Sequence, residues 1–163
     1  MIDFIFLLVL FTAVGVGIIS GLLFTFSNFA MSALGSLPAE SGISAMQAIN
    51  IKIINPVFLL VFAGSGVSSI ALSAIAMTRW QEAGMPWVLA GSLLYLAGGI
   101  FITARFNVPL NDRLAAINPA ASGSELIWRE YIRSWLPWNH LRTVATSASV
   151  AAFALGLAEM GMR

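Results

Sequence analysis

The sequence contains no cysteine, and this absence removes several kinds of chemistry at once. Disulfide bonds, thiolate nucleophiles and cysteine-ligated metals are all excluded. Histidine is almost absent too, because His140 is the only one, and no second histidine or glutamate stands near it at a helical metal-site spacing. We therefore expect no metal centre, and no Ser-His-Asp or phosphate-loop pattern is recognisable.

Charged residues are also few. Charged residues make up 9% of the 163 residues and hydrophobic residues 59%, whereas soluble domains carry roughly 25% charged residues. A helix needs about 20 apolar residues to cross a bilayer. The residues without charge fall into four stretches, which are 4–39, 53–78, 83–104 and 143–158. The last stretch is long enough if its helix opens near Pro137.

These stretches predict an all-α integral membrane four-helix bundle that forms a single domain over 1–163. The predicted spans are approximately 4–34, 54–78, 84–106 and 137–160. Short interfacial helices are expected in the first and third loops. Glu40 lies near the start of the first, and Asn55-Pro56 ends it. Pro109 is expected to end the third span, and 107–136 to form a polar-aromatic loop with a surface helix inside it.

The basic residues predict the orientation of the bundle. The first and third loops hold most of them, which favours a cytoplasmic position for these loops in what we expect to be a bacterial inner membrane. The net charge of +1 gives no reason to expect a nucleic-acid partner. The basic residues of the two loops are Lys52, Arg105, Arg113, Arg129, Arg133 and Arg142.

Polar side chains come from all four helix ends on that same side of the bundle. A polar pocket that caps an apolar bundle suits a flat, mostly hydrophobic small molecule with a few polar atoms. The competing interpretation is that these amides only satisfy backbone groups at broken helix ends. The residues from the first three helix ends are Asn28, Gln47, Asn50, Asn107, Asn111 and Asp112.

The segment 128–142 is the densest polar-aromatic part of the chain. Trp128, Tyr131 and Trp135 recur at i, i+3 and i+7, so they share one helix face. Taken alone, this stripe is explained better by an interfacial helix whose aromatic residues lie at the level of the lipid headgroups. The stripe is followed by Trp138, Asn139, His140 and Arg142. Asn139 and Arg142 lie one turn apart, and His140 is rotated away from them but within reach of a neighbouring helix.

These motifs together resemble the anthrone oxygenase-like family of small four-helix membrane proteins. Some members oxidise anthrones to anthraquinones with molecular oxygen and no evident cofactor. The resemblance rests on Phe26-Ser27-x-Phe29-x-Met31, Met46-Gln47-x-Ile49-Asn50, Asn55-Pro56, Asn107-Val-Pro109-Leu-Asn111-Asp112 and Trp128-x-x-Tyr131-x-x-x-Trp135-x-x-Trp138-Asn139-His140-x-Arg142.

The leading hypothesis is an oxidoreductase that acts with molecular oxygen on a hydrophobic phenolic or anthrone- or quinol-like aromatic. His140 is the expected base because imidazole accepts protons near neutral pH, and Asp112 orients or replaces it. Arg142, with Asn139 or Asn107, would hold the developing oxyanion. The aromatic residues of 128–138 would supply stacking faces.

Two other functions stay open at this point. The first is a non-catalytic quinone-, haem- or lipid-binding module, or a small subunit of a membrane complex. No cofactor is expected, and haem, with His140 as its single axial ligand, is the alternative. The second is a transporter, which the lack of ionisable residues at mid-membrane depth disfavours. The lipid bilayer and a hydrophobic small molecule are the expected partners, with a homo-oligomer as a further option.

Overall fold

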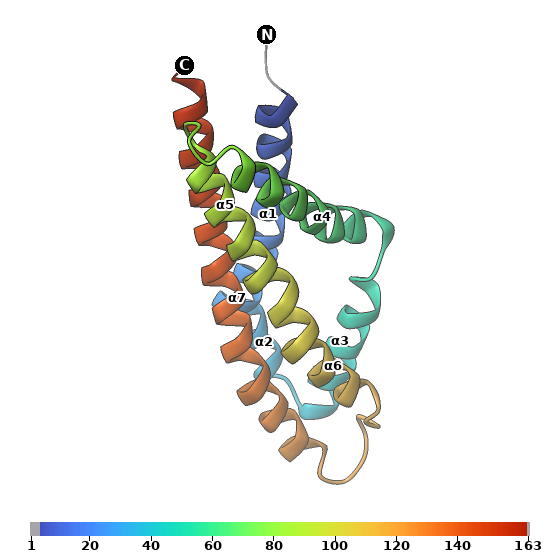
Figure 1. The fold of residues 1–163 in the computed structure, drawn as a ribbon. Coiled ribbons are helices and arrows are strands. Elements are labelled where there is room, and N and C mark those ends of the chain that lie inside the picture. The colour runs from blue at the N-terminus through green and yellow to red at the C-terminus, as the bar shows by residue number, and fades with distance from the viewer. Residues whose placement is uncertain (1–3, 163) are drawn as a thin grey trace.

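The computed structural model describes residues 4–162, and every regular element in that range is a helix (Figure 1). Four helices are long and apolar enough to cross a membrane: Phe4–Gly35, Pro56–Thr78, Met85–Ala115 and Ser124–Gly161. A shorter helix, α3 (Ala39–Lys52), joins the first of these to the second. The predicted all-α bundle is confirmed, and the four helices fit an integral membrane protein.

Two of the long helices contain π-helical turns. The first combines α1 (Phe4–Thr25), η1 (Phe26–Ala30) and α2 (Met31–Gly35). The third combines α5 (Met85–Leu94), η2 (Tyr95–Phe101), η3 (Thr103–Asn107) and α6 (Val108–Ala115). Short π-helical turns inside α-helices are often found at functional sites, and residues of η1 and η3 line the cavity described below.

The expectation that Pro109 ends the third span is wrong. Pro109 is the second residue of α6, and the helix runs on to Ala115. A proline ring normally clashes with the carbonyl one turn before it and lacks the amide hydrogen that this carbonyl needs. The wide turns of η3 stand directly before Pro109, where local π adjustment can accommodate both effects. Asn107 and Asn111 therefore lie on one continuous helix.

Pro137 does not open the fourth span either. It lies inside α7 (Ser124–Gly161), which is 38 residues long. At 1.5 Å per residue such a helix measures about 57 Å, well beyond the ~30 Å hydrocarbon core of a bilayer. The first three turns of α7, predicted as a separate surface helix in the loop 107–136, thus continue directly into the spanning part.

The second half of α7 packs against α1 and α5. Glycine allows the closest approach: a Cβ added at Gly98 would lie 2.2 Å from the Cβ of Ala145. Interhelical hydrogen bonds add to this contact, with Ser149 donating to the Gly91 carbonyl at 2.6 Å and a 2.8 Å bond between Ser20 and Ser147. Small residues and hydroxyl groups at helix interfaces are the usual features of membrane bundles.

The buried side chains form two separate clusters. The membrane cluster lies among α1, α4 (Pro56–Thr78), α5 and the second half of α7, and contains Val16, Leu72 and Phe153. The second, which we call the cap cluster, gathers α2, α3, α6 and the first turns of α7 around Trp128, Tyr131 and Trp135. Its three aromatic residues are only 3–5% exposed, so they form a core and do not face lipid.

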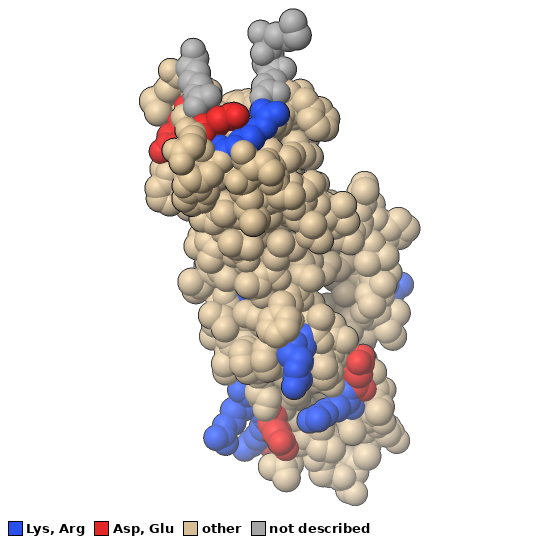
Figure 2. All heavy atoms as spheres, viewed as in Figure 1, with Lys and Arg blue, Asp and Glu red and all other residues tan. Residues whose placement is uncertain are grey.

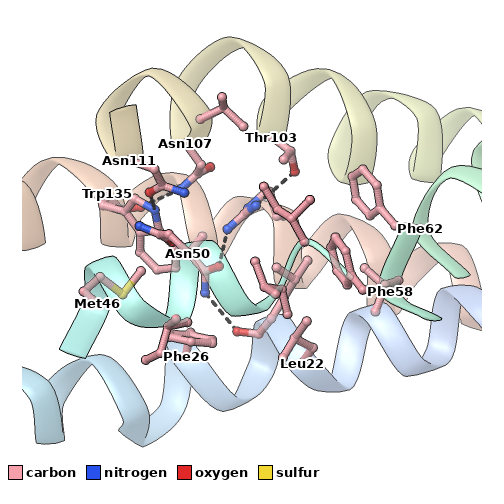
Figure 3. A pocket seen from close by; sticks show the side chains of 18 of the residues that line it. Leu22, Phe26, Met46, Asn50, Phe58, Phe62, Thr103, Asn107, Asn111 and Trp135 are labelled. Atoms are coloured by element: carbon pink, nitrogen blue, oxygen red, sulfur yellow. Dashed lines mark hydrogen bonds between the residues drawn. The ribbon is translucent and has the colours of Figure 1, made fainter. Parts of the chain in front are cut away.

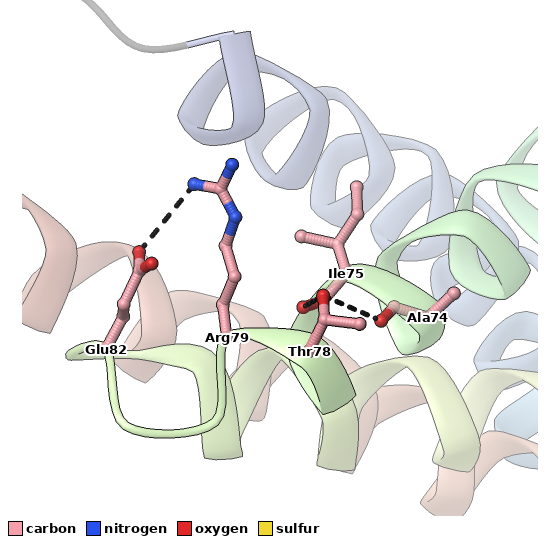
Figure 4. Close-up of polar contacts among 5 residues, drawn as sticks. All are labelled: Ala74, Ile75, Thr78, Arg79 and Glu82. Atoms are coloured by element: carbon pink, nitrogen blue, oxygen red, sulfur yellow. Dashed lines mark hydrogen bonds and ion pairs between the residues drawn. The ribbon is translucent and has the colours of Figure 1, made fainter.

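The two ends of the bundle differ in their polar contacts. At the end with both termini, Arg79 follows α4 and pairs with Glu82 at 3.8 Å in an exposed turn (Figure 4). Glu159 closes this turn by accepting from the Gly84 amide and the Trp87 indole. At the other end, basic side chains gather around α6 and the start of α7. Figure 2 shows an uncharged zone between the two ends, as expected of a membrane-embedded surface.

Candidate functional site

A cavity of about 270 Å³ lies where the membrane cluster meets the cap cluster. Its walls come from α1 and η1, from α3 and α4, from η3 and α6, and from α7. This volume is close to the lower limit of ligand pockets, which is about 300 Å³. The cavity therefore suits one small molecule.

The cavity has a polar end and an apolar end. Figure 3 shows Asn50, Asn107, Asn111 and Trp135 gathered at one end, with Phe58, Phe62 and Leu22 at the other. Thr103 lies between them on η3. The remaining lining residues are Ile19, Leu23, Phe26, Met46, Ile49, Ile53, Ile54, Leu59, Val108, Asn139 and Arg142. A mostly apolar lining with a few converging polar groups is the usual character of a ligand site.

Arg142 is the only charged side chain among the lining residues. It is 6% exposed. Its Nη1 donates to the Thr103 hydroxyl at 2.9 Å, and its Nη2 donates to the Asn139 Oδ1 at 2.6 Å. The guanidinium carbon lies 5.4 Å from the centre of the Trp135 ring, in cation–π contact. These three contacts fix the orientation of the guanidinium.

No carboxylate neutralises this cation within the described chain 4–162. The two ion pairs found there join Arg79 to Glu82 and Arg129 to Glu125, both on the exposed surface. The Nε of Arg142 also has no hydrogen-bond partner. Arginine keeps its proton in proteins even when it is buried. The cavity therefore contains an uncompensated positive charge, an arrangement that is costly unless a ligand or counter-charge offsets it.

Asn139 holds the arginine through a network that reaches α1 and η1. Its Nδ2 donates to the Leu23 carbonyl at 2.9 Å and to the Ser27 hydroxyl at 2.8 Å. Because both amide hydrogens are used in this way, the Oδ1 faces Arg142 as an acceptor. Ser27 in turn shares a 2.9 Å hydrogen bond with Thr143. The polar contacts thus link η1 to α7 across the cavity.

Asn111 is held by two donors from α7. Its Oδ1 accepts from the Tyr131 hydroxyl at 2.8 Å and from the Trp135 indole at 2.9 Å. Tyr131 therefore uses its proton to bond Asn111 and is not a partner anion for Arg142. Asn107 donates to the Trp135 carbonyl at 3.3 Å, and its buried Oδ1 has no partner. That oxygen remains able to accept a hydrogen bond.

The cavity opens between the start of α4 and α6. Ile54 and Leu59 line it yet are 66% and 45% exposed, and Val108 on the opposite side is 41% exposed. Figure 1 shows α4 leaning away from the bundle toward its first residues, and Figure 2 shows a hollow beneath that part of the molecule. Apolar residues therefore border this opening.

The structure places two predicted catalytic residues outside the cavity. His140 and Asp112 are both exposed and line none of it. On one continuous α7, each residue turns by about 100° relative to the one before it. His140 therefore points away from the cavity when Asn139 points in, and Asp112 likewise follows Asn111. The expectation that the imidazole shares a cavity with the guanidinium is wrong.

The remaining predicted site residues divide between the cavity and other positions. Asn50, Asn107, Asn111, Trp135 and Asn139 line the cavity beside Arg142. The others lie elsewhere, and each has a place that does not involve the cavity wall. Asn28 is exposed, Gln47 donates to the carbonyls of Leu114 and Ile117, Trp138 stacks on Phe106, and Trp128 and Tyr131 belong to the cap cluster.

Sequence reasoning missed Thr103 and Ser27, which hold Arg142 and Asn139. The signal for Thr103 was its spacing, because Thr103, Asn107 and Asn111 recur every four residues and so share one helix face. Because the helix was expected to end at Pro109, Thr103 and Asn107 were not expected to share a helix face with Asn111. Phe26 belongs to the motif 26–31 quoted above but was not predicted to line a site. Phe58 and Phe62, the rest of this aromatic wall, were missed because isolated phenylalanines in an apolar stretch carry no distinguishing pattern.

Between residues 4 and 162, no group of three or more His, Cys, Asp and Glu side chains could hold a metal ion. The lining is instead suited to an organic molecule with an anionic or carbonyl oxygen near Arg142 and rings against the phenylalanines. The expectation of a cofactor-free protein stays a prediction.

Of three comparisons with known proteins, one finds a match. No curated protein and no solved structure matches the chain. The family model described as anthrone oxygenase matches residues 52–153, which is more than half of the sequence. The matched range contains Thr103, Asn107, Asn111, Trp135 and Arg142, five of the polar or aromatic residues that line the cavity. The chain belongs to the anthrone oxygenase family.

Proposed function

We propose that this protein is a membrane-embedded oxidoreductase that uses molecular oxygen to oxidise a hydrophobic phenolic or anthrone-like aromatic. The observation that carries the proposal is the uncompensated guanidinium of Arg142 inside a cavity that is otherwise apolar or amide-lined. Family membership points to an oxygenase role. The arrangement of charge and rings supports an aromatic substrate whose oxygen becomes negative during the reaction.

The chemistry requires little from the protein. An anthrone loses a proton from the carbon opposite its ketone and becomes an enolate, whose negative charge rests largely on oxygen. The enolate passes one electron to molecular oxygen, and the radical and superoxide recombine at that carbon as a peroxide anion, which takes a proton from water, replacing the one lost at the start, to give a hydroperoxide. Loss of water then leaves a second ketone, so that one oxygen atom enters the quinone and the other leaves as water. A group that stabilises the oxyanion accelerates the ionisation.

Arg142 is the residue we assign to this stabilisation. Its contacts with Thr103 and Asn139 hold the guanidinium in place before the substrate arrives. Such preorganisation in a water-poor site makes a charge far more effective than it is in water. Phe26, Phe58 and Phe62 offer faces for the rings. We further propose that the substrate enters from the lipid between Leu59 and Val108, since a neutral anthrone partitions into the bilayer.

The test is oxygen uptake by the detergent-purified protein with an anthrone as substrate. Quinone formation is followed by absorbance, and its mass shows whether one oxygen atom derives from ¹⁸O₂. We expect turnover to fall by about 100- to 1,000-fold in Arg142→Gln, the usual cost of losing an oxyanion donor. Arg105→Gln is the matched control, because Arg105 is exposed on the neighbouring η3. Equal rates in the two variants would contradict the proposal.

A passive binding protein for a quinone or a related aromatic is the second candidate. It is favoured by one specific observation: no acid, histidine or lysine is among the residues that line the cavity. The same measurement separates the two functions. Stoichiometric binding of a quinone without any protein-dependent oxygen uptake would favour binding alone.

A further inference from the structure

The cavity combines one buried cation with an absence of proton acceptors. Arg142 is held by neutral partners, Thr103 and Asn139, and packs against Trp135. The two groups expected to act as base, His140 and Asp112, point away from the cavity and are exposed. A substrate that must lose a proton therefore has no carboxylate or imidazole to take it within the cavity wall.

No other charged group near this region adds a proton acceptor or a second charge to the cavity wall. The charged residues are Glu40 and Lys52 on α3, Arg105 on η3, and Asp112 and Arg113 on α6. All five are exposed, and none lines the cavity. The described residues of α1 and η1 carry no charged side chain, and α4 has none between Pro56 and Thr78. Tyr131, on α7, donates its proton to Asn111. The electrostatics that a ligand meets are thus those of a single cation.

We infer that the cavity binds its aromatic ligand as the ionised enolate or phenolate, with the oxyanion at Arg142, and that this charge replaces a general base. The inference rests on the proposed function, whose substrate class it narrows to acids that ionise near neutral pH. The O–H or C–H bond breaks, the electron pair stays on the ligand and ends mainly on its oxygen, and the proton passes to water.

A buried opposite charge within about 4–6 Å lowers the pKa of an acid by about one to three. Binding that favours the anion by tenfold lowers the pKa of the bound ligand by one. The apolar walls alone would have the opposite effect, because removing an anion from water raises its pKa. The direction of the change therefore distinguishes a cavity that acts through Arg142 from one that only shelters a hydrophobic ring.

The experiment uses 2-hydroxyanthraquinone, whose phenolate absorbs at longer wavelength than the phenol. This probe is already a quinone, so its ionisation can be followed without any oxidation. It is titrated with the full-length protein in a neutral detergent and in protein-free micelles of the same detergent. We expect its pKa to be lower on the protein by at least one. A pKa equal to or higher than the micelle value, or no binding, would overturn the inference.

Two variants test whether Arg142 is responsible. Arg142→Gln should return the pKa of the probe to the micelle value or above it, whereas Arg142→Lys, which keeps the charge, should retain part of the decrease. Arg105→Gln, which removes an exposed charge nearby, should leave the pKa as in the wild type. An unchanged pKa in Arg142→Gln would overturn the assignment. The wild-type result is decisive even if that variant fails to fold.

The result is independent of the test for catalysis. A lowered pKa without oxygen uptake on an anthrone would leave the anion site intact and contradict only the proposed oxidation. Oxygen uptake that depends on Arg142, combined with an unchanged pKa of the probe, would uphold the oxidation and remove the inference that the ligand binds as its anion.

Discussion

Asn139→Asp is the substitution that tests the role of the uncompensated charge most directly. The side chain keeps its size, but the oxygen that now accepts from Arg142 at 2.6 Å becomes part of a carboxylate. The variant thus supplies the counter-ion that the wild-type cavity lacks. We expect it to weaken binding of an anionic ligand while binding of a neutral one is preserved.

The magnitude follows from the geometry. Two opposite charges about 4 Å apart interact by ~4 kcal/mol at an effective dielectric constant of 20. Each ~1.4 kcal/mol corresponds to a factor of ten in affinity. The new carboxylate offsets most of the attraction between Arg142 and a bound phenolate, so the affinity for the phenolate should fall by about 100- to 1,000-fold. A neutral quinone of the same shape has no such attraction to lose.

The substitution also has a structural cost. The Leu23 carbonyl, 2.9 Å from the Asn139 Nδ2, would lose its donor and face an oxygen. An unsatisfied buried carbonyl costs about 1–3 kcal/mol. The new ion pair with Arg142 opposes this loss, and the Ser27 hydroxyl can turn to donate to the carboxylate. We therefore expect the thermal stability of the variant to change little.

The assay compares two ligands in the same detergent. Quenching of tryptophan fluorescence gives the affinity for 2-hydroxyanthraquinone at alkaline pH and for unsubstituted anthraquinone, and Asn28→Asp is the matched control on an exposed position. Loss of both affinities to the same extent would mean that the substitution damages the cavity. An unchanged phenolate affinity in a folded Asn139→Asp protein would refute the electrostatic reasoning.

Three further predictions follow from contacts described above. His140→Ala and Asp112→Asn replace exposed residues outside the cavity lining. Each should change kcat/KM for an anthrone by no more than a factor of about two or three, as expected of ordinary surface substitutions. A large loss of kcat/KM would show that the residue takes part in the reaction. Leu59→Trp should narrow the opening of the cavity and so raise KM for the anthrone. Val57→Trp is the control, because Val57 is exposed but does not line the cavity, and it should leave KM unchanged. Oxygen-uptake kinetics give KM for both variants. Gly98→Val should lower the thermal midpoint because its Cβ would lie 2.2 Å from that of Ala145, a clash worth about 1–3 kcal/mol. Gly21→Ala, with no atom within 4 Å, should leave the thermal midpoint unchanged.

The number of helices could be predicted from the sequence because hydropathy is a property of composition. The ends of the helices could not be predicted in this way, and both wrongly predicted boundaries are at prolines. Pro109 and Pro137 were interpreted as helix boundaries, as they would be in water. In a membrane bundle the backbone groups freed by a proline can be satisfied by local π-helical turns and by neighbouring groups. The turns of η3 stand directly before Pro109, and no residue pattern announces such turns.

The cavity residues that the sequence predicted include those that helix periodicity places on one face. Asn107 and Asn111, one turn apart, both line the cavity, as do Trp135, Asn139 and Arg142. His140 does not line the cavity, because the same periodicity turns it away from Asn139, whereas its prediction as a base rested on the chemistry of imidazole. Thr103 and Ser27 were missed because their role is to position Arg142 and Asn139 across helices. Such contacts depend on the packing of α1 and η3 against α7, which one sequence does not reveal.

Because the cavity lies between two hydrophobic clusters, a bound ligand should change how cooperatively the protein unfolds. The membrane cluster and the cap cluster each contribute walls, so an occupant would touch both and join them into one cooperative unit. By mass action, a ligand present at 100 times its dissociation constant adds about 2.7 kcal/mol to the stability of whatever it bridges. The loaded protein should then unfold more cooperatively than the empty one.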